Sequence, residues 1–334
     1  MTIRDVAELA GVSIATVSRV VNDRPDVSPE TRRVVMRVMR EHGFAMNRSA
    51  RGLARGRTGL VGFTVPLLSE PYFTDILAGA ADALSMTDQR LVICPTHHQH
   101  AREVSLLERL MGGTTDGAIV VLPEETNAEL LRLQDLGYPF VVCDPREPPI
   151  DGIPTVCAAH ADGARAAVGH LLALGHRRIA MIIGSPGWVA SEERLEGYRV
   201  ALATAGIAFD EQLVAGGSYA IQVGRRATAQ LLSLAEPPTA IFASNDNLAF
   251  GAIRAIVDRG LRVPDDVSIV GFDDTEHASC FLPSLTTVRQ PLAELGRTAV
   301  SLLNRILDGQ RIEALRVELA TRLVVRASTG PARV

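Results

Sequence analysis

The chain of 334 residues contains no lysine, and all 34 of its basic side chains are arginine. Chemistry that needs a lysine amine, such as a phosphate-binding P-loop or a Schiff base, is therefore excluded. Nucleic-acid recognition is not excluded, because the arginine guanidinium binds both phosphate and guanine.

Cysteine is also scarce, and its four copies form no C-x-x-C pair. We expect Cys94, Cys143, Cys157 and Cys280 to be free thiols in a reducing compartment. The sequence has no run of 18 apolar residues, and its first ten residues include acids. These features predict a soluble cytoplasmic protein without a signal peptide or a membrane span.

Charge is unevenly distributed along the chain, although the net charge is only -4. Residues 1–58 carry eleven arginines and six acids, for a charge of +5, whereas the remaining residues carry -9. A basic head on an acidic body predicts a head that meets a polyanion. The length and the 47% hydrophobic content allow two or three domains.

The first 45 residues carry three helix patterns. Thr2 and Asp5 form a candidate capping box, and Gly11 is placed to end the first helix. Ser13 and Ser28 are candidate N-caps of the second and third helices. Three short helices with a glycine in the first turn predict a helix-turn-helix unit.

The second of these helices divides its residues between two faces. The inward face is predicted to hold Val17, Val20 and Val21. The outward face is unusually apolar at its N-terminal end and holds Ile14, Ala15, Ser18 and Arg19. Three core helices of a larger domain are the alternative, which this face and the charge asymmetry disfavour.

The segments TIRDVAELAGVSIATVSRVVN, VSPETRRVV and NRSARGL resemble the DNA-binding head of the lactose/galactose repressor (LacI/GalR) family, without a gap through residues 2–53. The resemblance implies that the second helix enters the major groove and that Ile14, Ala15 and Arg19 read bases. Arg19 can bind guanine bidentately, whereas the other two offer only apolar contact, as to a thymine methyl. Within this head the expected DNA contacts are Ser13, Ile14, Ala15, Thr16, Ser18, Arg19 and Asn22.

Residues 46–58, MNRSARGLARGRT, have the composition of a linker. The family resemblance instead implies a hinge helix that folds on operator DNA, with Leu53 wedged into a minor-groove step. The further contacts expected from this segment are Asn47, Arg48 and Arg51. Met46 replaces a proline that many family members have, and Gly52 lies in mid-helix, so the hinge helix is predicted to be harder to order without DNA.

From Leu60 onward, short apolar runs alternate with helical patterns. This predicts parallel sheets covered on both faces, arranged as two doubly wound lobes with a cleft at the carboxyl ends of their strands. The predicted strands are 60–65, 91–94, 118–122, 140–143, 179–184, 240–244 and 267–272. The predicted helices include 74–86, 125–136, 161–174, 192–205, 221–234 and 247–259. Residues 283–291, PSLTTVRQP, are interpreted as an extended crossover.

The predicted fold is therefore a small all-α helix-turn-helix head on an α/β body of two parallel-sheet lobes. The predicted domains are a head over 1–45, a hinge or linker over 46–58, and an effector-binding and dimerisation body over 59–334.

The resemblance continues through GHRRIAMIIG, RLEGYRVAL, SNDNLAFGAIRA and RVPDDVSIVGFDDTEHASCFLPSLTTVRQP. It implies a body shaped like a periplasmic sugar-binding protein, with a small effector in its cleft. The implied effector contacts are Asp144, Arg194, Asn245 and Asp273, with Tyr72, Phe73, Trp188 and Tyr219 at aromatic or variable positions. Carboxylates and an arginine fork can bind neighbouring sugar hydroxyls while an aromatic ring covers the C–H face.

Structural alternatives remain for several of these residues. Asn245 can cap the helix that follows it, and Arg194 with Asp273 can form an ion pair between the lobes. The aromatic residues Tyr72, Phe73 and Trp188 can belong to the core.

The sequence carries no catalytic signature such as G-x-S-x-G or H-E-x-x-H, and no cofactor is expected. The histidines of PTHHQHA, His97, His98 and His100, have no further metal ligands nearby in the sequence. We therefore interpret them as a polar loop at the cleft rim rather than as a metal site. The chain ends at RASTGPARV without a leucine heptad, which predicts a homodimer rather than a tetramer.

Together these features predict a transcriptional repressor that a small sugar-like effector releases from a pseudo-palindromic operator. A regulator whose DNA binding is strengthened by a purine or a sugar phosphate is the first alternative. A solute-binding protein is the second, and the missing signal peptide and the basic head argue against it. An enzyme is disfavoured because no nucleophile–base pairing is evident.

Overall fold

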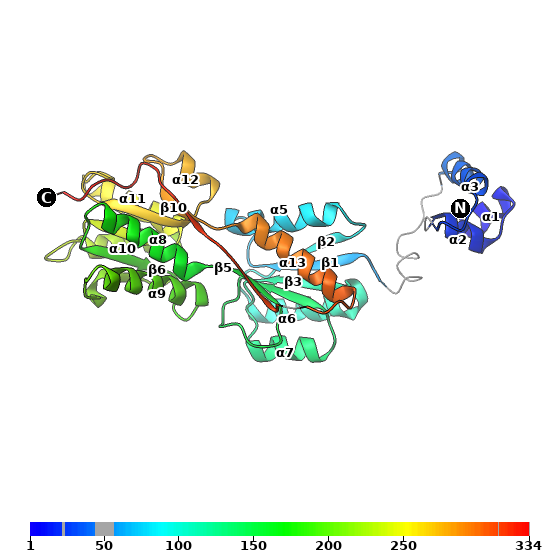
Figure 1. Ribbon diagram of the computed structural model, residues 1–334, viewed down its shortest axis with the longest axis horizontal. Coiled ribbons are helices and arrows are strands. Elements are labelled where there is room, and N and C mark those ends of the chain that lie inside the picture. The colour runs from blue at the N-terminus through cyan, green and yellow to red at the C-terminus, as the bar shows by residue number, and fades with distance from the viewer. Residues whose placement is uncertain (22–23, 44–56, 313, 334) are drawn as a thin grey trace. The chain divides into compact units, whose positions relative to one another are not determined.

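The computed structural model describes residues 1–21, 24–43, 57–312 and 314–333. The chain divides into two compact units, Met1–Thr58 and Gly59–Val334 (Figure 1). Each unit buries its own hydrophobic core, so the two are described separately.

Residues 1–21 and 24–43 of the N-terminal unit form three helices, α1 (Ile3–Ala10), α2 (Ile14–Val21) and α3 (Pro29–Glu41). α1 begins with the predicted capping box, in which Thr2 and Asp5 each accept a hydrogen bond from the other's backbone amide. It ends at Gly11, whose φ of 64° is left-handed and lets its amide bond the last carbonyls of the helix. The chain can therefore turn directly into α2.

The next two helices also begin at their predicted caps. The hydroxyl of Ser13 accepts from the amide of Thr16 at 3.0 Å, and that of Ser28 accepts from the amide of Thr31 at 3.2 Å. One stripe from each helix then forms the core of the unit. The buried residues of this core are Val6, Ala7, Val17, Val20, Val35 and Val38.

The larger unit contains two α/β lobes. The first lobe has an all-parallel sheet in the order β2-β1-β3-β4-β5-β11. Its strands are β1 (Leu60–Val65), β2 (Arg90–Pro95), β3 (Gly117–Val121), β4 (Phe140–Cys143), β5 (Thr155–Ala158) and β11 (Arg316–Leu319). Helices α5 (Pro71–Ser85) and α13 (Leu292–Leu307) cover one face, and α6 (His100–Arg109) and α7 (Asn127–Asp135) cover the other.

Helices α5 and α13 lie unusually close together. A Cβ atom on Gly79 would lie 1.8 Å from the carbonyl oxygen of Ala293, and one on Gly296 would lie 2.0 Å from that of Ile76. Only glycine fits at these two positions. The contact fixes α13, which lies near the C-terminal end of the chain, to a lobe whose helices α5, α6 and α7 come from the first half of the chain.

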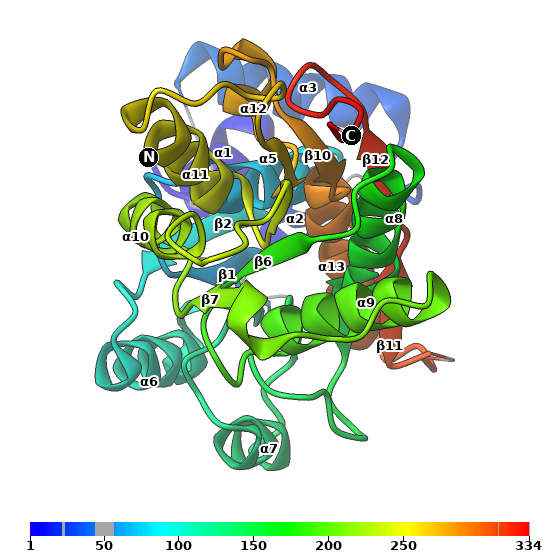
Figure 2. The ribbon, with the colours of Figure 1, turned by 90° about the vertical axis from the view of Figure 1, so that its left-hand side faces the viewer.

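The second lobe has a sheet in the order β7-β6-β8-β9-β10-β12, in which only the β10–β12 pair is antiparallel. Its strands are β6 (Ile179–Ile183), β7 (Val214–Gly216), β8 (Ala240–Ala243), β9 (Ser268–Asp273), β10 (Thr286–Arg289) and β12 (Arg322–Val324). Helices α8 (His160–Ala173) and α9 (Val189–Thr204) cover one face, and α10 (Ile221–Leu231) and α11 (Asp246–Asp258) cover the other (Figure 2). The short helix α12 (Glu276–Cys280) follows β9.

Three short segments connect the lobes: residue 159 between β5 and α8, residues 290–291 between β10 and α13, and residues 320–321 between β11 and β12. The last of these is visible in Figure 1 as the red segment that runs from one lobe to the other. The hydroxyl of Thr321 donates to the carbonyl of Ala159 at 3.1 Å, so the first and third crossovers are joined directly.

The structure confirms the two-lobed architecture and all seven predicted strands, with small shifts at their ends. The interpretation of residues 283–291 as an extended crossover is wrong, because β10 occupies Thr286–Arg289 and only residues 290–291 pass between the lobes. The unpredicted strands β5, β7, β10, β11 and β12 have three or four residues each, and all of them contain threonine, glycine or a charged residue. The predicted strands β4 (FVVC) and β8 (AIFA) are as short as β5, but they are apolar throughout and so stand out in the sequence. In the described parts of the chain, no helix is long and apolar enough to cross a membrane.

Candidate ligand cavity and DNA-recognition helix

A cavity of about 490 Å³ lies between the two lobes, lined by residues that follow the carboxyl ends of their strands. Doubly wound sheets bind ligands at this position. All eight predicted effector contacts line it: Tyr72, Phe73, Asp144, Trp188, Arg194, Tyr219, Asn245 and Asp273. The fold therefore brings into one cavity side chains that are far apart in the sequence.

Asp144 directly follows β4 in the first lobe and is almost fully buried. Its Oδ2 accepts from the hydroxyl of Tyr72 at 2.5 Å, and its Oδ1 lies 3.1 Å from Nε2 of His160. Burial alone would raise the pKa of Asp144, but these hydrogen bonds and the charge of Arg194 hold it below its ordinary value. Asp144 is therefore an ionised acceptor at neutral pH.

Asp273 ends β9 in the second lobe, and its φ of 118° is strained for a residue other than glycine. Its Oδ1 accepts from Nε2 of Gln290 at 2.7 Å. Burial raises the pKa of Asp273 well above its ordinary range, and the neighbouring Asp246 adds to the effect, while Arg194 opposes it. Strain and desolvation at one carboxylate are typical of a functional site.

Arg194 projects from α9 and is only 3% exposed, with its guanidinium 3.9 Å from the ring centroid of Phe272. Its Nη1 donates to the carbonyl of Ser244 at 2.5 Å, and its Nη2 lies 3.1 Å from Nδ1 of His160. The partners of Arg194 are thus a carbonyl and an imidazole, rather than the Asp273 carboxylate of the alternative interpretation. Its buried Nε–H has no hydrogen-bond partner among the described residues.

Asn245 both caps a helix and lines the cavity. It is the N-cap of α11, where its Oδ1 accepts from the amide of Leu248 at 2.8 Å. The same residue lines the cavity, and its Nδ2 lies 3.5 Å from the carbonyl oxygen of Tyr219. Capping fixes the orientation of the side-chain amide and does not remove it from the cavity.

A tilted pair of aromatic rings, Trp188 and Tyr219, lines part of the cavity. The rings of Trp188 and Tyr219 lie 5.7 Å apart, and the guanidinium of Arg146 lies 4.7 Å from the centroid of Trp188. The carbonyl of Arg146 also accepts from the amide of Val189 at 2.9 Å. Because Arg146 belongs to the first lobe and Trp188 to the second, this cation–π contact connects the lobes.

Tyr72 and Phe73 differ in role although they are neighbours. Phe73 is buried in the core of the first lobe, whereas Tyr72 is half-buried and directs its hydroxyl to Asp144. The two rings meet edge to face at 5.2 Å. Phe73 is therefore a core residue that also lines the cavity, whereas Tyr72 offers a hydroxyl group there.

Several polar residues of the cavity were not predicted from the sequence, among them Glu70, Glu124, Arg146 and His277. Glu124 forms an ion pair with Arg146 and lies 3.1 Å from Nδ1 of His98. Glu70 and His277 also line the cavity. Each of these four unpredicted residues follows the carboxyl end of a strand, and this position could have identified them.

The histidine loop lies at this rim. His98 lines the cavity, whereas His100 lies 2.9 Å from the carboxylate of Glu129 on α7. Within the described residues, no group of three or more metal-ligating side chains is arranged to hold an ion.

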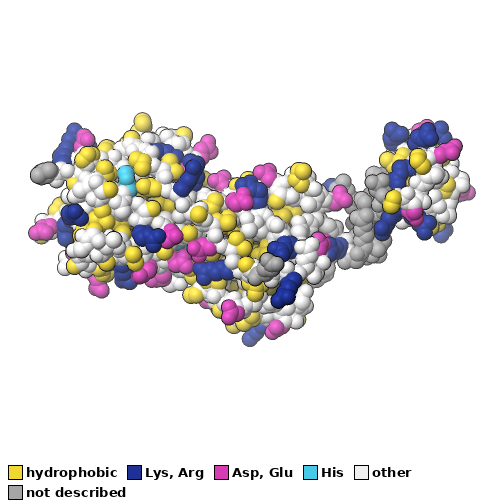
Figure 3. Space-filling model, in the orientation of Figure 1, with side chains coloured by type: hydrophobic (Ala, Val, Ile, Leu, Met, Phe, Trp, Pro, Cys, Tyr) yellow, Lys and Arg dark blue, Asp and Glu magenta, His cyan; other side chains and the backbone are white. Residues whose placement is uncertain are grey.

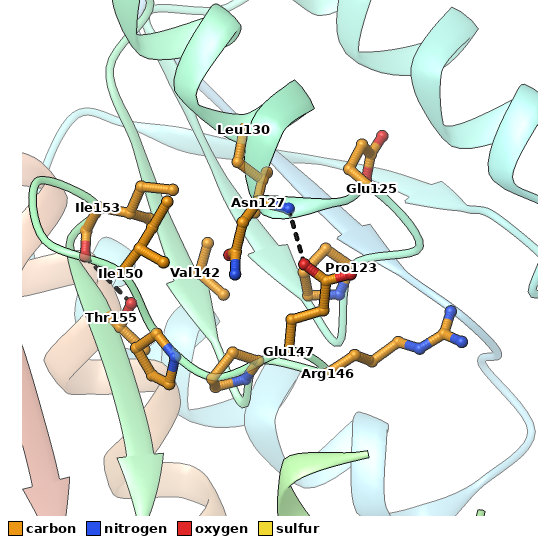
Figure 4. Close-up of a pocket in the computed structure, with 12 residues that line it drawn as sticks. Pro123, Glu125, Asn127, Leu130, Val142, Arg146, Glu147, Ile150, Ile153 and Thr155 are labelled. Atoms are coloured by element: carbon orange, nitrogen blue, oxygen red, sulfur yellow. Dashed lines mark hydrogen bonds between the residues drawn. The ribbon is translucent and has the colours of Figure 1, made fainter. Parts of the chain in front are cut away.

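A second, much smaller crevice lies between α7 and the loop that follows β4 (Figure 4). Its volume is about 10 Å³, room for one water molecule at most. The amide of Asn127 donates across it to Glu147 at 2.9 Å, and the side chain of Glu125 points away from it. The crevice is therefore too small for a ligand other than water.

The outward face of α2 carries the residues predicted to read bases. Ile14 is 44% exposed, and Ala15 and Arg19 are also exposed. Arg19 forms an ion pair with Asp26 at 3.6 Å, but both side chains are more than half exposed, so the pair is weak. Figure 3 shows basic side chains on this unit.

Two other predicted contacts lie at the N-terminal end of α2. The hydroxyls of Ser13 and Thr16 are 2.9 Å apart there, where backbone amides favour phosphate. Ser18 is half-buried on the same helix. The remaining predicted contacts lie outside the described residues: Asn22, Asn47, Arg48, Arg51 and Leu53.

Comparison with known families agrees with both units. Residues 2–47 match the bacterial regulatory proteins of the lacI family, and residues 168–329 match the periplasmic binding protein-like domain. The HTH-type transcriptional regulator DegA of Bacillus subtilis is 35% identical over 333 residues, 99% of this chain and 98% of DegA. The regulator CelR of Thermobifida fusca is 37% identical over 333 residues, 98% of each chain.

Solved structures give the same result. The lac repressor dimer bound to operator and the anti-inducer ONPF is similar, with a TM-score of 0.87, 32% identity and coverage of 99% of each chain. The complex of the regulator CelR with cellobiose has a TM-score of 0.76 and 35% identity, and the match covers 98% of this chain and 99% of CelR. With two family matches and relatives of this identity over nearly its whole length, the chain belongs to the LacI family of bacterial transcription regulators.

Proposed function

We propose that this protein is a cytoplasmic, homodimeric repressor that an uncharged carbohydrate releases from its operator. The observation that carries the proposal is the composition of one cavity, which is lined by Asp144, Arg194 and Asp273 together with the aromatic pair Trp188 and Tyr219. Buried carboxylates and a guanidinium provide directional partners for hydroxyl groups, and aromatic faces suit the C–H side of a sugar ring. The volume of about 490 Å³ is within the usual range of roughly 300–1,000 Å³ for small-ligand sites.

The charge of the lining favours an uncharged ligand over a phosphorylated one. Five carboxylates and two guanidiniums line the cavity: Glu70, Glu124, Asp144, Asp246 and Asp273 with Arg146 and Arg194. Both guanidiniums already have partners. Arg146 forms an ion pair with Glu124, and Arg194 donates to the carbonyl of Ser244. A phosphate would therefore find both guanidiniums engaged and would meet the ionised carboxylate of Asp144, which selects against it.

The head supplies the other half of the proposal. Two heads of a dimer would place two copies of α2 in successive major grooves of a pseudo-palindrome, as helix-turn-helix dimers do. Relatives named as a lac repressor dimer on operator and a CelR–cellobiose complex support a link between DNA binding and a sugar. Such a link between two sites is typically worth about 1–3 kcal/mol.

A mobility-shift experiment tests this function. A labelled fragment from upstream of the protein's own gene is titrated at low salt, with glucose, ribose, cellobiose, glucose 6-phosphate or hypoxanthine added in turn. We expect retardation without ligand and release by an uncharged sugar. Absent retardation would contradict the repressor. Retardation strengthened by the phosphate or the purine would instead support the corepressor alternative.

A pair of arginine variants makes the test specific to the cavity. Arg194→Ala removes the buried guanidinium, and we expect it to abolish the sugar response while leaving operator binding intact. The matched control is Arg199→Ala on the same helix, since Arg199 stacks on Phe209 at 4.5 Å and does not line the cavity. A normal sugar response in Arg194→Ala would remove Arg194 from the site.

A further inference from the structure

His160 lies at the point where the chain first passes from one lobe to the other. It is the first residue of α8 and follows the crossover residue Ala159 directly. Its side chain is 1% exposed, and it does not line the cavity. It contacts Asp144 of the first lobe through Nε2 and Arg194 of the second lobe through Nδ1, at 3.1 Å in each case. A chain of hydrogen bonds therefore passes from lobe to lobe directly behind the cavity.

The partners of His160 fix the position of its ring proton. A guanidinium can only donate, so Nδ1 must accept the hydrogen bond from Arg194. The ring proton is then on Nε2, which donates to the carboxylate of Asp144. Each ring nitrogen thus has one partner, and each partner is a residue of the cavity lining in a different lobe. No other tautomer satisfies both contacts.

A residue of the second crossover also holds a carboxylate of the cavity, although it does not bridge the lobes. Gln290 lies between β10 and α13 and is 4% exposed. Its Nε2 donates to Asp273 at 2.7 Å, and its backbone amide donates to the carbonyl of the same residue at 3.2 Å. Asp144 and Asp273, two of the three buried carboxylates of the cavity, are therefore each held by a side chain within or next to a segment that joins the lobes.

We propose that His160 is a positioning residue that couples the occupancy of the cavity to the relative arrangement of the two lobes. A ligand that draws Asp144 or Arg194 toward itself must weaken one of the two hydrogen bonds of His160. Because His160 adjoins a crossover, this change acts where the lobes rotate against one another. The coupling rests on the proposed function, but the bridge itself can be tested without ligand or DNA, so the two can fail separately.

Distance measurement by pulsed electron spin resonance tests the bridge. Spin labels are placed at Ala128→Cys on α7 and Ala203→Cys on α9, both exposed, in the full chain with Cys280→Ser and diluted with unlabelled protein. We expect one narrow distance distribution for the parent protein. His160→Leu, which removes both hydrogen bonds, should broaden or shift it. His160→Gln, which supplies both a donor and an acceptor, should restore it.

A second histidine on the same helix provides the matched control. His170 lies 3.0 Å from Thr329, and both belong to the second lobe. His170→Leu should therefore leave the distance distribution unchanged. The bridge is refuted if His160→Leu gives the parent distribution, or if His170→Leu alters it equally.

Nitrogen-15 spectroscopy of the unsubstituted protein tests the same bridge without any variant that could fail to fold. The His160 ring should show a protonated Nε2 and an unprotonated, hydrogen-bonded Nδ1 at neutral pH. A ring protonated on Nδ1 would overturn the assignment, because that nitrogen could not then accept from Arg194.

Discussion

The hydroxyl of Tyr72 donates to Oδ2 of Asp144 at 2.5 Å and so ties the first turn of α5 to the end of β4. Burial and the adjacent carboxylate raise the pKa of Tyr72 well above its ordinary value, so the phenol keeps its proton. The second oxygen of Asp144 faces His160. The carboxylate is thus held in one orientation by two donors before any ligand binds, which reduces the ordering that binding requires.

Tyr72→Phe removes one of these donors and should weaken binding of the releasing sugar about tenfold, because a hydrogen bond to a charged group contributes about 1.5–3 kcal/mol. Isothermal calorimetry with that sugar measures the change. Tyr138→Phe is the control, since its hydroxyl contacts Thr115 at 2.6 Å and lies outside the cavity lining. Equal affinity in Tyr72→Phe and the parent would show that this bond does not prepare the site.

Asp273→Asn should make the protein more stable and less responsive. The substitution removes a carboxylate whose raised pKa shows that its charge is disfavoured there, and it keeps the shape of the side chain. Replacing a functional group that destabilises the folded state commonly adds about 0.5–2 kcal/mol to the free energy of unfolding. Thermal unfolding and sugar release of operator DNA are measured together, with exposed Asp265→Asn as control. A loss of stability with the sugar response retained would be the opposite of this expectation.

Glu103 and Glu125 form a buried acidic pair behind the cavity rim. Glu103 accepts from the hydroxyl of Thr64 at 3.1 Å and from the amide of Glu124 at 2.7 Å. Both oxygens of Glu125 lack a hydrogen-bond donor among the described residues. Burial and the charge of Glu103 raise the pKa of Glu125 to about 9, so Glu125 is protonated at neutral pH.

This pair should make the protein less stable as the pH rises. A group with a folded pKa of about 9 and an ordinary value of 4.5 stabilises fully below pH 4.5, and its contribution is lost as the pH rises through 9. The slope is at most about 1.4 kcal/mol per pH unit. In urea unfolding between pH 6 and 9, the free energy of unfolding of Glu125→Gln should depend less on pH than that of the parent protein. Glu108→Gln, at an exposed position, should show the pH dependence of the parent. A parent slope that persists in Glu125→Gln would assign the pH dependence to other groups.

Arg19→Ala should weaken operator binding and relax its sequence preference at one position. A bidentate contact from arginine to guanine discriminates by roughly 1–3 kcal/mol. Binding to a set of operators with every single base change measures both effects. Arg40→Ala at the end of α3 serves as control, because its guanidinium bonds the carbonyl of Met36 in its own helix. A uniform loss across all bases would instead assign Arg19 to phosphate.

Leu53→Ala tests the hinge, which lies outside the described residues. If Leu53 wedges between bases as the family resemblance implies, the variant should bind operator much more weakly and bend it less. Sugar binding should be unchanged, since the cavity belongs to the other unit. Operator affinity equal to that of the parent would refute the wedge.

The local rules of helix ends made the head predictable from sequence. Thr2, Gly11 and Ser28 each act within a few residues of their position, and the structure confirms all three. Seven strands were likewise visible as nearly continuous apolar runs. The packing of α13 against α5 could not be predicted in the same way. It depends on Gly79 and Gly296, which lie far apart in the chain.

The cavity was predictable only in part. Asp144, Arg194 and Asp273 were found through family motifs, and the structure places all three in one lining. His160 carried no such motif, and its role depends on which residues two separate lobes bring to its two nitrogens. Contacts of this kind follow from tertiary geometry rather than from sequence spacing.

The late position of α13 and β11 also constrains how the body can fold during synthesis. The sheet of the first lobe begins at Leu60 but is completed by β11, which ends at Leu319. Nearly all of the second lobe must therefore leave the ribosome before the first lobe can close. Until then the apolar face of β1, β3 and β4 that α13 will cover stays open. Assembly of the cavity is thus among the last steps in making the molecule.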